Sequence, residues 1–124
     1  MGNTGRITLI ESDARAITDA IRNFASDSIV EIVESQVERA ISKYARADIV
    51  VVDPPRAGVG SKTLQTILAL QPRTLVYVSC DPATLARDTR VALDNGYRLD
   101  QIRALDLFPM THHVECVARF MLNN

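Results

Sequence analysis

The sequence is poor in the residues that characterise several common protein classes. Its 124 residues include two cysteines, Cys80 and Cys116, and no tryptophan. Two cysteines are too few for a disulfide framework or a cysteine-rich zinc site, so a reducing cytoplasm is the expected location. No apolar run approaches the roughly 20 residues that a membrane-spanning helix needs, and no signal-peptide pattern opens the sequence. We therefore expect neither a disulfide-stabilised protein nor a membrane partner.

A strong excess of charge of either sign is also absent. Fourteen basic and 15 acidic residues give a net charge of −1, and the sequence pI is near 6.1. This balance argues against a free-standing nucleic-acid coat protein, although it allows an enzyme that grips RNA through another domain. The length and the hydrophobic content of 47% are typical of one globular domain.

Apolar runs and helical patterns alternate along the chain. Short apolar runs predict strands, and apolar residues at helical spacing predict helices. The predicted strands are 6–10, 29–33, 48–52, 73–78, 97–108 and 114–122. One predicted helix begins after Ser12 or Asp13. A second begins at a capping box over 35–38 and extends to Tyr44. Two more span 61–70 and 81–94.

This alternation predicts an α/β fold with a mostly parallel sheet, helices on both faces and right-handed crossovers. No helix-length segment separates the last two strands, so they predict an antiparallel hairpin with its turn at 109–113. In such sheets, ligands bind beyond the carboxyl ends of the strands. Glu11, Asp53 and Cys80 follow three of those ends, and Glu115 begins the antiparallel last strand. We therefore expect all four side chains at one edge of the sheet.

The stretch Ser79-Cys80-Asp81-Pro82 carries the clearest chemical signal. An apolar run ends there and a helix starts at once, because Asp81 is a good N-cap and Pro82 suits the first helical position. Cys80 is thereby placed beside the positive end of a helix dipole, which favours the reactive thiolate. The alternative is a small buried hydrophobic residue, the usual role of a free cysteine. Cys116, in phase with the apolar residues of the last strand, is expected to be such a core residue.

The other polar residues have simpler explanations that stay open. Glu11 could cap the following helix, Asp53 could begin a proline-bounded turn, and Arg56 could be a solvated loop charge. His112 and His113 could form a metal site, but no third ligand is spaced nearby, so we expect no metal.

Three motifs resemble those of a known enzyme family. They are Asp53-Pro54-Pro55-Arg56-x-Gly58, Ser79-Cys80-Asp81-Pro82-x-Thr84-x-Ala86-Arg87-Asp88 and Asp106-x-Phe108-Pro109-x-Thr111-x-His113-x-Glu115. In this order and spacing they are similar to the closing motifs of RNA 5-methyluridine methyltransferases. Those enzymes use S-adenosylmethionine to methylate C5 of uridine in tRNA or ribosomal RNA. The resemblance runs from about Ile7 to the C-terminus and implies a Rossmann-like class I methyltransferase sheet.

The resemblance also implies a role for individual residues. Cys80 matches the nucleophile and Glu115 the general base. Asp53 matches an aspartate of the cofactor site and catalytic pocket, and Glu11 matches the acidic residue that holds the cofactor ribose. The substrate-binding residues that the same motifs imply are Arg56, Thr111 and His113.

The implied chemistry explains why these residue types are needed. C5 of uracil is a poor nucleophile, and addition of a thiolate to C6 creates an enolate whose C5 can attack the methyl sulfonium. A base must then remove the C5 proton so that the thiol is expelled. The target base would have to be flipped out of structured RNA or presented unstacked.

The sequence departs from the family pattern at its start. The family's domain opens with a strand and a Gly-rich loop that cradles the methionine part of the cofactor, whereas residues 1–5 lead directly into what resembles the second strand. We therefore expect 1–124 to be a partial catalytic domain with an incomplete sheet, inactive alone because the Gly-rich loop is absent. Either strands 6–10 and 48–52 pair directly, or a second copy or an N-terminal portion on another chain fills the gap.

Two other functions stay open. One is a non-catalytic, truncated α/β module that binds a partner chain. The absent Gly-rich loop favours this function, whereas the intact Cys80, Glu115 and Asp53 argue against it. The other is an amino-group methyltransferase, which Asp53-Pro54-Pro55 alone suggests. Those enzymes place an aromatic residue after the prolines and need no cysteine, so Arg56 and Cys80 argue against this function.

Overall fold

The computed structural model describes residues 5–107, 109–111 and 113–124. Strands and helices follow one another in the predicted order, with one additional 3₁₀ turn. Contacts divide the chain into two compact units, residues 1–43 and 44–124, and each is described by itself. Within the described ranges, no helix is both long and apolar enough to cross a membrane.

The first unit contains a two-stranded parallel sheet. Its elements are β1 (Ile7–Glu11), α1 (Ala14–Asn23), β2 (Val30–Glu34), α2 (Val37–Ala40) and the 3₁₀ turn η1 (Ile41–Lys43). β1 and β2 pair over their whole length. Asp13 caps α1, because its carboxylate accepts hydrogen bonds of 2.9 Å from the amides of Arg15 and Ala16. The predicted start of this helix is thus confirmed.

The second helix of this unit is shorter than predicted. Gln36, and not Ser35, is its N-cap, so the predicted capping box is wrong. The Ser35 hydroxyl instead donates a hydrogen bond of 3.0 Å to the carbonyl oxygen of Gln36. Without a side-chain cap, α2 extends for a single turn and continues as η1, and Tyr44 lies beyond both.

The second unit contains a four-stranded sheet in the order β3-β4-β6-β5. Its elements are β3 (Ile49–Val52), α3 (Ser61–Leu68), β4 (Thr74–Ser79), α4 (Pro82–Asp94), β5 (Tyr97–Leu105) and β6 (Glu115–Leu122). β3 and β4 are parallel, and β6 is antiparallel to both of its neighbours. The predicted hairpin is therefore confirmed, although its first strand ends at Leu105, and Phe108 lies outside the described residues.

Local sequence explains where α4 begins and ends. Asp81 accepts hydrogen bonds from two amides of the first turn, and Pro82 occupies that turn, where a missing N–H costs nothing. The helix ends before Gly96, whose φ of +87° is a left-handed conformation that glycine adopts without strain. Both signals were visible in the sequence.

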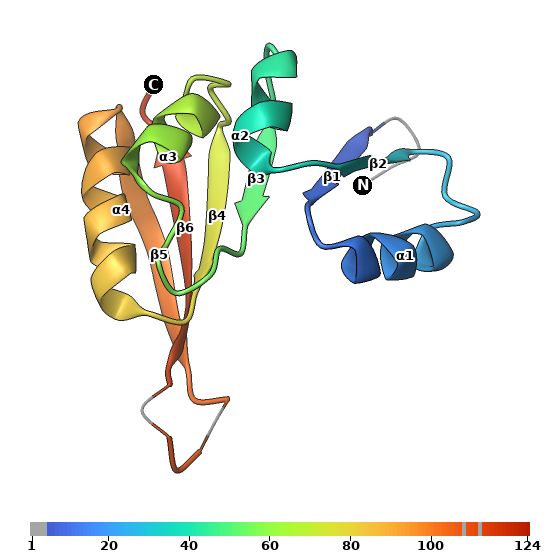
Figure 1. Ribbon diagram of the computed structural model, residues 1–124. Coiled ribbons are helices and arrows are strands. Elements are labelled where there is room, and N and C mark those ends of the chain that lie inside the picture. The colour runs from blue at the N-terminus through green and yellow to red at the C-terminus, as the bar shows by residue number, and fades with distance from the viewer. Residues whose placement is uncertain (1–4, 108, 112) are drawn as a thin grey trace. The chain divides into compact units, whose positions relative to one another are not determined.

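The core of the second unit lies between its sheet and its two helices. Figure 1 shows α3 and α4 on the same face of this sheet. Alternate residues of β4 and β6 form the buried face of the two strands: Leu75, Tyr77, Ser79, Cys116, Ala118 and Phe120. Cys116 is therefore a core residue, as predicted.

No described helix of the second unit covers the other face of its sheet. Both helices of this unit lie on one face of its sheet, because successive right-handed crossovers in one direction place their helices on the same side. Ile49 and Val51 of β3 are 47% and 65% exposed. A shallow hollow of about 240 Å³ on this face is lined by Val76, Gln101, Arg103, Val117 and Arg119.

β1 and β3 belong to different sheets. The direct pairing of these two strands, one of the two arrangements expected from the sequence, is therefore not formed. In the described part of the chain, β3 pairs with β4 on one side and has no strand on the other. The sheet of the second unit thus ends at an open edge, formed by a β-branched strand of four residues.

Candidate active site

Cys80 lies in the turn between β4 and α4. The buried Ser79 hydroxyl shapes this turn, because it accepts a hydrogen bond of 3.1 Å from the Asp81 amide and donates one of 2.9 Å to the Asp81 carbonyl oxygen. Cys80 itself is partly exposed. Its position at the end of a strand, beside the first turn of a helix, agrees with the prediction, and its exposure argues against a purely structural core cysteine.

The strand register brings Glu115 next to Cys80. The last pair between β4 and β6 is Ser79 with Cys116, so one further step of the register sets Cys80 opposite Glu115. Side chains alternate between the two faces of a sheet, and Ser79 and Cys116 are both on the buried face. Their neighbours Cys80 and Glu115 are therefore expected on the opposite face. The predicted nucleophile and the predicted base share one edge of the sheet.

Asp53 stands at the same edge. It directly follows Val52, which pairs with Tyr77 of β4, so it is adjacent to the strand that leads to Cys80. Its side chain is exposed and has no hydrogen-bond or ion-pair partner among the residues that the structure describes. Its carboxylate is thus available to a ligand.

Arg56 and His113 lie 57 positions apart in the sequence and come together in the structure. Nη2 of Arg56 lies 2.5 Å from Nδ1 and 2.8 Å from Nε2 of His113. The Thr111 hydroxyl accepts a hydrogen bond of 3.3 Å from the His113 amide. These contacts join the loop after β3 to the β5–β6 turn. The three predicted substrate-binding residues therefore form one cluster.

A metal site at this cluster is not supported by the described residues. His112, the other half of the histidine pair, lies outside them. Among the described side chains, no three from His, Cys, Asp and Glu form a group that could hold a metal ion.

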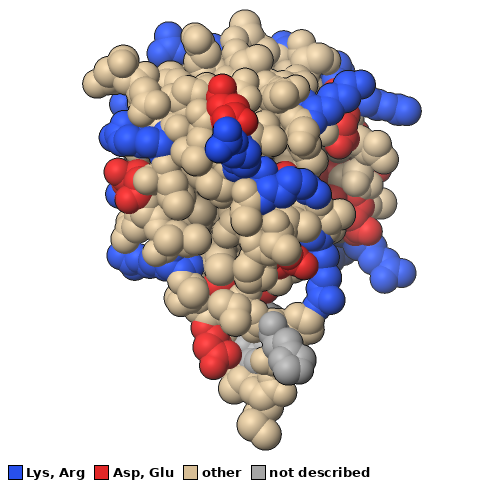
Figure 2. All heavy atoms as spheres, turned by 90° about the vertical axis from the view of Figure 1, so that its left-hand side faces the viewer, with Lys and Arg blue, Asp and Glu red and all other residues tan. Residues whose placement is uncertain are grey.

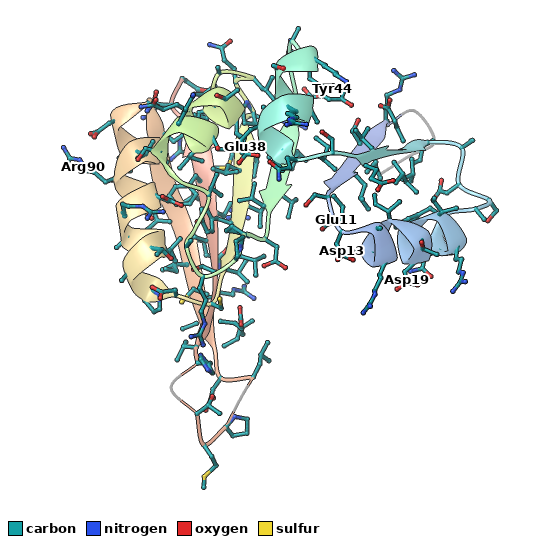
Figure 3. The ribbon with its side chains drawn as sticks, in the orientation of Figure 1. Glu11, Asp13, Asp19, Glu38, Tyr44 and Arg90 are labelled. Carbon is teal, nitrogen blue, oxygen red and sulfur yellow. The ribbon has the colours of Figure 1, made fainter. Side chains whose placement is uncertain are left out.

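Glu11 belongs to the first unit, where it ends β1 (Figure 3). Because β1 is not in the sheet that leads to Asp53, Cys80 and Glu115, the prediction that all four share an edge of one sheet is wrong for Glu11. Its Oε1 accepts hydrogen bonds from the amides of Ser12 and Asp13, at 2.6 and 2.8 Å, so the side chain orders the turn into α1. No described residue donates to Oε2. One carboxylate oxygen is thus fixed by the backbone and the other can accept a ligand hydroxyl, as a ribose would require. The residue fits a nucleoside ligand.

A buried network that the sequence analysis did not predict lies behind the Cys80 edge. Asp88 of α4 is 1% exposed, and its carboxylate accepts hydrogen bonds from the Tyr77 hydroxyl at 2.6 Å and from the Arg87 guanidinium at 2.8 and 3.0 Å. Burial by itself raises the pKa of Asp88, but these hydrogen bonds and those from backbone amides outweigh it and hold the pKa below its usual value. Burial, together with the hydrogen bond to Asp88, raises the pKa of Tyr77 well above 10.

One feature of the sequence does point to this network. The buried positions of α4 are 85, 88 and 92, at helical spacing, and the middle one is a carboxylate. A charged residue in the apolar phase of a helix indicates a buried polar partner, because burial without one is costly. That the partner is Tyr77 depends on how α4 packs on β4, which the helical pattern does not reveal.

The surface charge is mixed. Figure 2 shows Lys and Arg side chains interspersed with Asp and Glu side chains on the face in view. Among the described residues of this face, no broad basic patch of the kind that binds nucleic acid by charge alone is visible. Any RNA contact made here depends on a small number of placed side chains.

Comparison with known proteins identifies the family. Residues 3–122 match the tRNA (uracil-5-)-methyltransferase family. An uncharacterized RNA methyltransferase of Streptomyces avermitilis is 47% identical over 120 residues, which are 95% of this chain and 28% of that protein. One from Streptococcus mutans is 39% identical over 115 residues, or 88% and 26% of the two chains. The chain thus spans little more than a quarter of the length of these curated relatives.

Solved structures agree with this assignment. The crystal structure of Pyrococcus abyssi tRNA (uracil-54, C5)-methyltransferase, in complex with S-adenosyl-L-homocysteine, is 37% identical, with a TM-score of 0.77 over 94% of this chain and 28% of that one. A putative RNA methyltransferase from Pyrococcus horikoshii has a TM-score of 0.74 at 13% identity, over 96% of this chain and 64% of that one, and shows the fold alone. The predicted Rossmann-like methyltransferase fold is therefore confirmed. With a match that runs from residue 3 to residue 122, the chain belongs to the tRNA (uracil-5-)-methyltransferase family.

Proposed function

We propose that this chain is the C-terminal part of the catalytic domain of an S-adenosylmethionine-dependent enzyme that methylates C5 of uridine in cytoplasmic tRNA or ribosomal RNA. The observation that carries the proposal is the register that sets Cys80 opposite Glu115 at an accessible edge. The family name, uracil-5-methyltransferase, supports the reaction. The bound S-adenosyl-L-homocysteine of the Pyrococcus abyssi structure supports the cofactor, since it is what S-adenosylmethionine leaves after methyl transfer.

Cys80 supplies the nucleophile in this reaction. Its Sγ, as the thiolate, forms a bond to C6 of uracil, and the electrons of the C5–C6 double bond move towards O4 to give an enolate. S-adenosylmethionine, when bound, supplies the methyl group that C5 takes up. The partly exposed position of Cys80, beside the first turn of α4, suits this role.

Glu115 removes the proton that C5 must lose. As the carboxylate takes this proton, the C5–H electrons restore the C5–C6 double bond, and the C6–Sγ bond breaks to release the Cys80 thiolate. Glu115 is partly exposed and has no hydrogen-bond or ion-pair partner among the described residues. Its carboxylate is thus free to act as the base.

The remaining predicted residues hold the two substrates. Glu11 accepts hydrogen bonds from the cofactor ribose, and Asp53 contributes to the cofactor site and the catalytic pocket. Arg56, with Thr111 and His113, binds the RNA around the target uridine, because a guanidinium forms bidentate contacts with phosphate and stacks on bases. The Arg56–His113 contact holds this cation near the edge that carries Cys80.

A covalent trap tests the two catalytic assignments. The chain, combined with the corresponding N-terminal portion of the Streptomyces avermitilis relative, is incubated with S-adenosylmethionine and a 5-fluorouridine-substituted tRNA transcript, and the mixture is resolved on a denaturing gel. Fluorine cannot leave C5 as a proton would, so the Cys80 adduct persists and shifts the protein band. Cys80→Ala abolishes the shift, whereas Cys116→Ser, which changes the buried cysteine, retains it. An adduct formed without Cys80 refutes the assignment of the nucleophile.

Unmodified RNA tests the base. With Glu115→Gln the methylated adduct forms but is not resolved, so the covalent RNA–protein species accumulates about tenfold or more above the wild-type level. Equally low adduct levels in the wild type and in Glu115→Gln would show that Glu115 is not the base.

Calorimetry with S-adenosyl-L-homocysteine tests the cofactor site separately. A dissociation constant below about 1 mM is expected for a working site. Glu11→Gln replaces a charged acceptor by a neutral one and weakens binding about tenfold, because a hydrogen bond to a charged group contributes about 1.5–3 kcal/mol. Asp19→Asn, which changes an exposed carboxylate on α1, is the control and leaves binding unchanged.

The open edge of β3 favours a second function, the binding of a partner chain. We propose that its occupant is the N-terminal portion that the family resemblance leads us to expect; the unmatched part of each relative is about three-quarters of its length. Such a segment would pair with β3 and cover Ile49 and Val51, which are unusually exposed for β-branched residues in a strand.

Sedimentation velocity distinguishes the possible occupants. This chain is measured alone and with the corresponding N-terminal portion of the Streptomyces avermitilis relative. A one-to-one complex that Val51→Lys abolishes supports the proposal, with Ile21→Lys on exposed α1 as the control. Self-association that Val51→Lys abolishes indicates a homodimer instead. A monomer under both conditions overturns the partner-binding function.

A further inference from the structure

α4 holds the 53–60 loop through three side chains on one side of its first turns. The Thr84 hydroxyl donates a hydrogen bond of 3.0 Å to the carbonyl oxygen of Arg56. Nη2 of Arg87 donates one of 2.8 Å to the carbonyl oxygen of Ala57. Because positions i, i+3 and i+4 share a helix face, Asp88 extends the same row.

Asp88 binds the end of this loop. Its Oδ2 accepts hydrogen bonds from the amides of Val59, at 2.9 Å, and Gly60, at 3.4 Å. The Val59 amide also donates to the Tyr77 hydroxyl at 3.1 Å, and that hydroxyl donates to Asp88. The loop backbone, the helix and β4 therefore meet at one carboxylate.

Gly58 shows how closely the loop approaches this carboxylate. Its φ is +77°, and a Cβ added there would lie 2.6 Å from Nη2 of Arg87 and 2.7 Å from Oδ2 of Asp88. The amide of Gly58 also closes a tight turn to the carbonyl oxygen of Pro55 at 2.8 Å. The loop can adopt this path because a side chain is missing where it meets the network.

The location of the network gives it a function beyond packing. Asp53 and Arg56 are at the start of the loop, and Cys80 directly precedes Asp81, the N-cap of α4. A well-packed apolar residue at position 88 would be as stable as a buried charge or more so, but it would leave the two loop amides without an acceptor. The carboxylate of Asp88 is therefore explained by the hydrogen bonds with which it fixes the 53–60 loop to α4, and not by how well it packs in the core.

We propose that Asp88 is a positioning residue of the active site, which sets the 53–60 loop, and with it Asp53 and Arg56, at a fixed place relative to Cys80. The inference rests on the proposed function for the meaning of these three residues. The Thr84 and Arg87 hydrogen bonds act with Asp88, and Tyr77 orients its carboxylate. Loss of Asp88 lets the loop move while the thiol and the sheet stay in place.

The test uses two buried tyrosines in the same chain. Tyr77→Phe removes the hydroxyl that binds Asp88, whereas Tyr97→Phe removes a hydroxyl that donates 2.8 Å to the carbonyl oxygen of Pro72. Asp88→Asn is the direct variant, and the tyrosine pair keeps the test decisive if that variant fails to fold. Amide hydrogen exchange at Val59 and Gly60 reports the loop.

Tyr77→Phe and Asp88→Asn are expected to speed exchange at the Val59 and Gly60 amides about tenfold or more, as for any local opening, while Tyr97→Phe leaves them within threefold of wild type. Unchanged exchange in the first two variants overturns the inference whatever the activity of the chain. This measurement uses neither RNA nor cofactor, so its failure is distinct from a failure of the proposed function.

The catalytic consequence is measured by adduct formation with 5-fluorouridine RNA at saturating RNA concentration. The rate is expected to fall about tenfold or more in Tyr77→Phe and Asp88→Asn, in line with misplaced catalytic groups, while Cys116 stays protected from iodoacetamide. A merely structural role would instead expose Cys116 in step with the loss of adduct, and that result refutes positioning. An unchanged adduct rate in a loosened loop refutes it as well.

Discussion

The two units of the chain differ in how they are packed. In the second unit, β4 and β6 bury large side chains against α3 and α4, and a fully hydrogen-bonded charge lies within that core. In the first, the described residues that are buried and apolar are Ile17, Ala20, Ala40 and Ile41, and the sheet has two strands. An isolated two-stranded sheet is marginal in water. The proposed covalent chemistry thus has a well-packed support, whereas Glu11, the proposed ribose ligand, is on the weakly packed unit.

Truncating one phenylalanine in each unit is the strongest test of this difference in packing. Phe120 of β6 is 1% exposed, whereas Phe24 at the end of α1 is 38% exposed. Phe120→Ala leaves a cavity and is expected to lower the free energy of unfolding by about 3–5 kcal/mol. Phe24→Ala is expected to lower it by less, about 1 kcal/mol, because more than a third of this residue is already in contact with solvent. Urea titrations followed by circular dichroism measure both, and equal losses would contradict the comparison.

Hydrogen exchange sharpens the same comparison without any substitution. Amides of the β1–β2 ladder are expected to exchange at least about 100-fold faster than those of the β4–β6 ladder, because a unit with few buried contacts opens locally more often. Exchange at native pH and temperature, resolved by residue, provides the rates. Similar protection in the two ladders would mean that the chain unfolds as one cooperative unit.

Much of the fold could be predicted because the strands and caps have strong local signals. The run over 73–78 is within one residue of β4, and Asp81, Pro82 and Gly96 mark α4 correctly. The errors are tertiary. Nothing local to Ser35 reveals that Gln36 is the N-cap of a single-turn helix. The separation of β1 from β3 depends on which strands find partners, and apolar runs do not specify that.

The site shows the same division. Cys80, Asp53 and Glu115 could be placed at one edge because the ends of parallel strands meet there, and the register agrees. Their roles in the reaction stay predictions. The link between Asp88 and Tyr77 could not be found from periodicity, because it joins a helix face to a strand face 11 positions away. The motif that begins at Ser79 includes Asp88, but its sequence gives that residue no role.

The stability of the second unit is expected to depend on pH at the acid end through its buried carboxylate, Asp88. The pKa of Asp88 is lower in the folded chain than its usual value of 3.8, so its ionised form stabilises the second unit above that pH. This stability is lost as the pH falls below about 4 and through the lower folded pKa. Asp88→Asn removes this part of the acid sensitivity. Asp48→Asn, which breaks an exposed ion pair with Arg46, is the control and should retain it. Urea titrations between about pH 2 and pH 6, a range that spans the ordinary pKa values of carboxyl groups, measure the difference.

The smallest expected effect separates two ion pairs on α4 itself. Arg90 and Asp94 are paired at 3.1 Å, but their side chains are 76% and 56% exposed, so Arg90→Gln should lower the free energy of unfolding by about 0.5 kcal/mol or less. Arg87→Gln should cost more, about 1–3 kcal/mol, because it takes a donor from the fully buried Asp88 carboxylate. Urea titrations of the two variants give both values. Equal costs would show that water replaces the Arg87 donor, and Asp88 would then be less isolated from solvent than its burial implies.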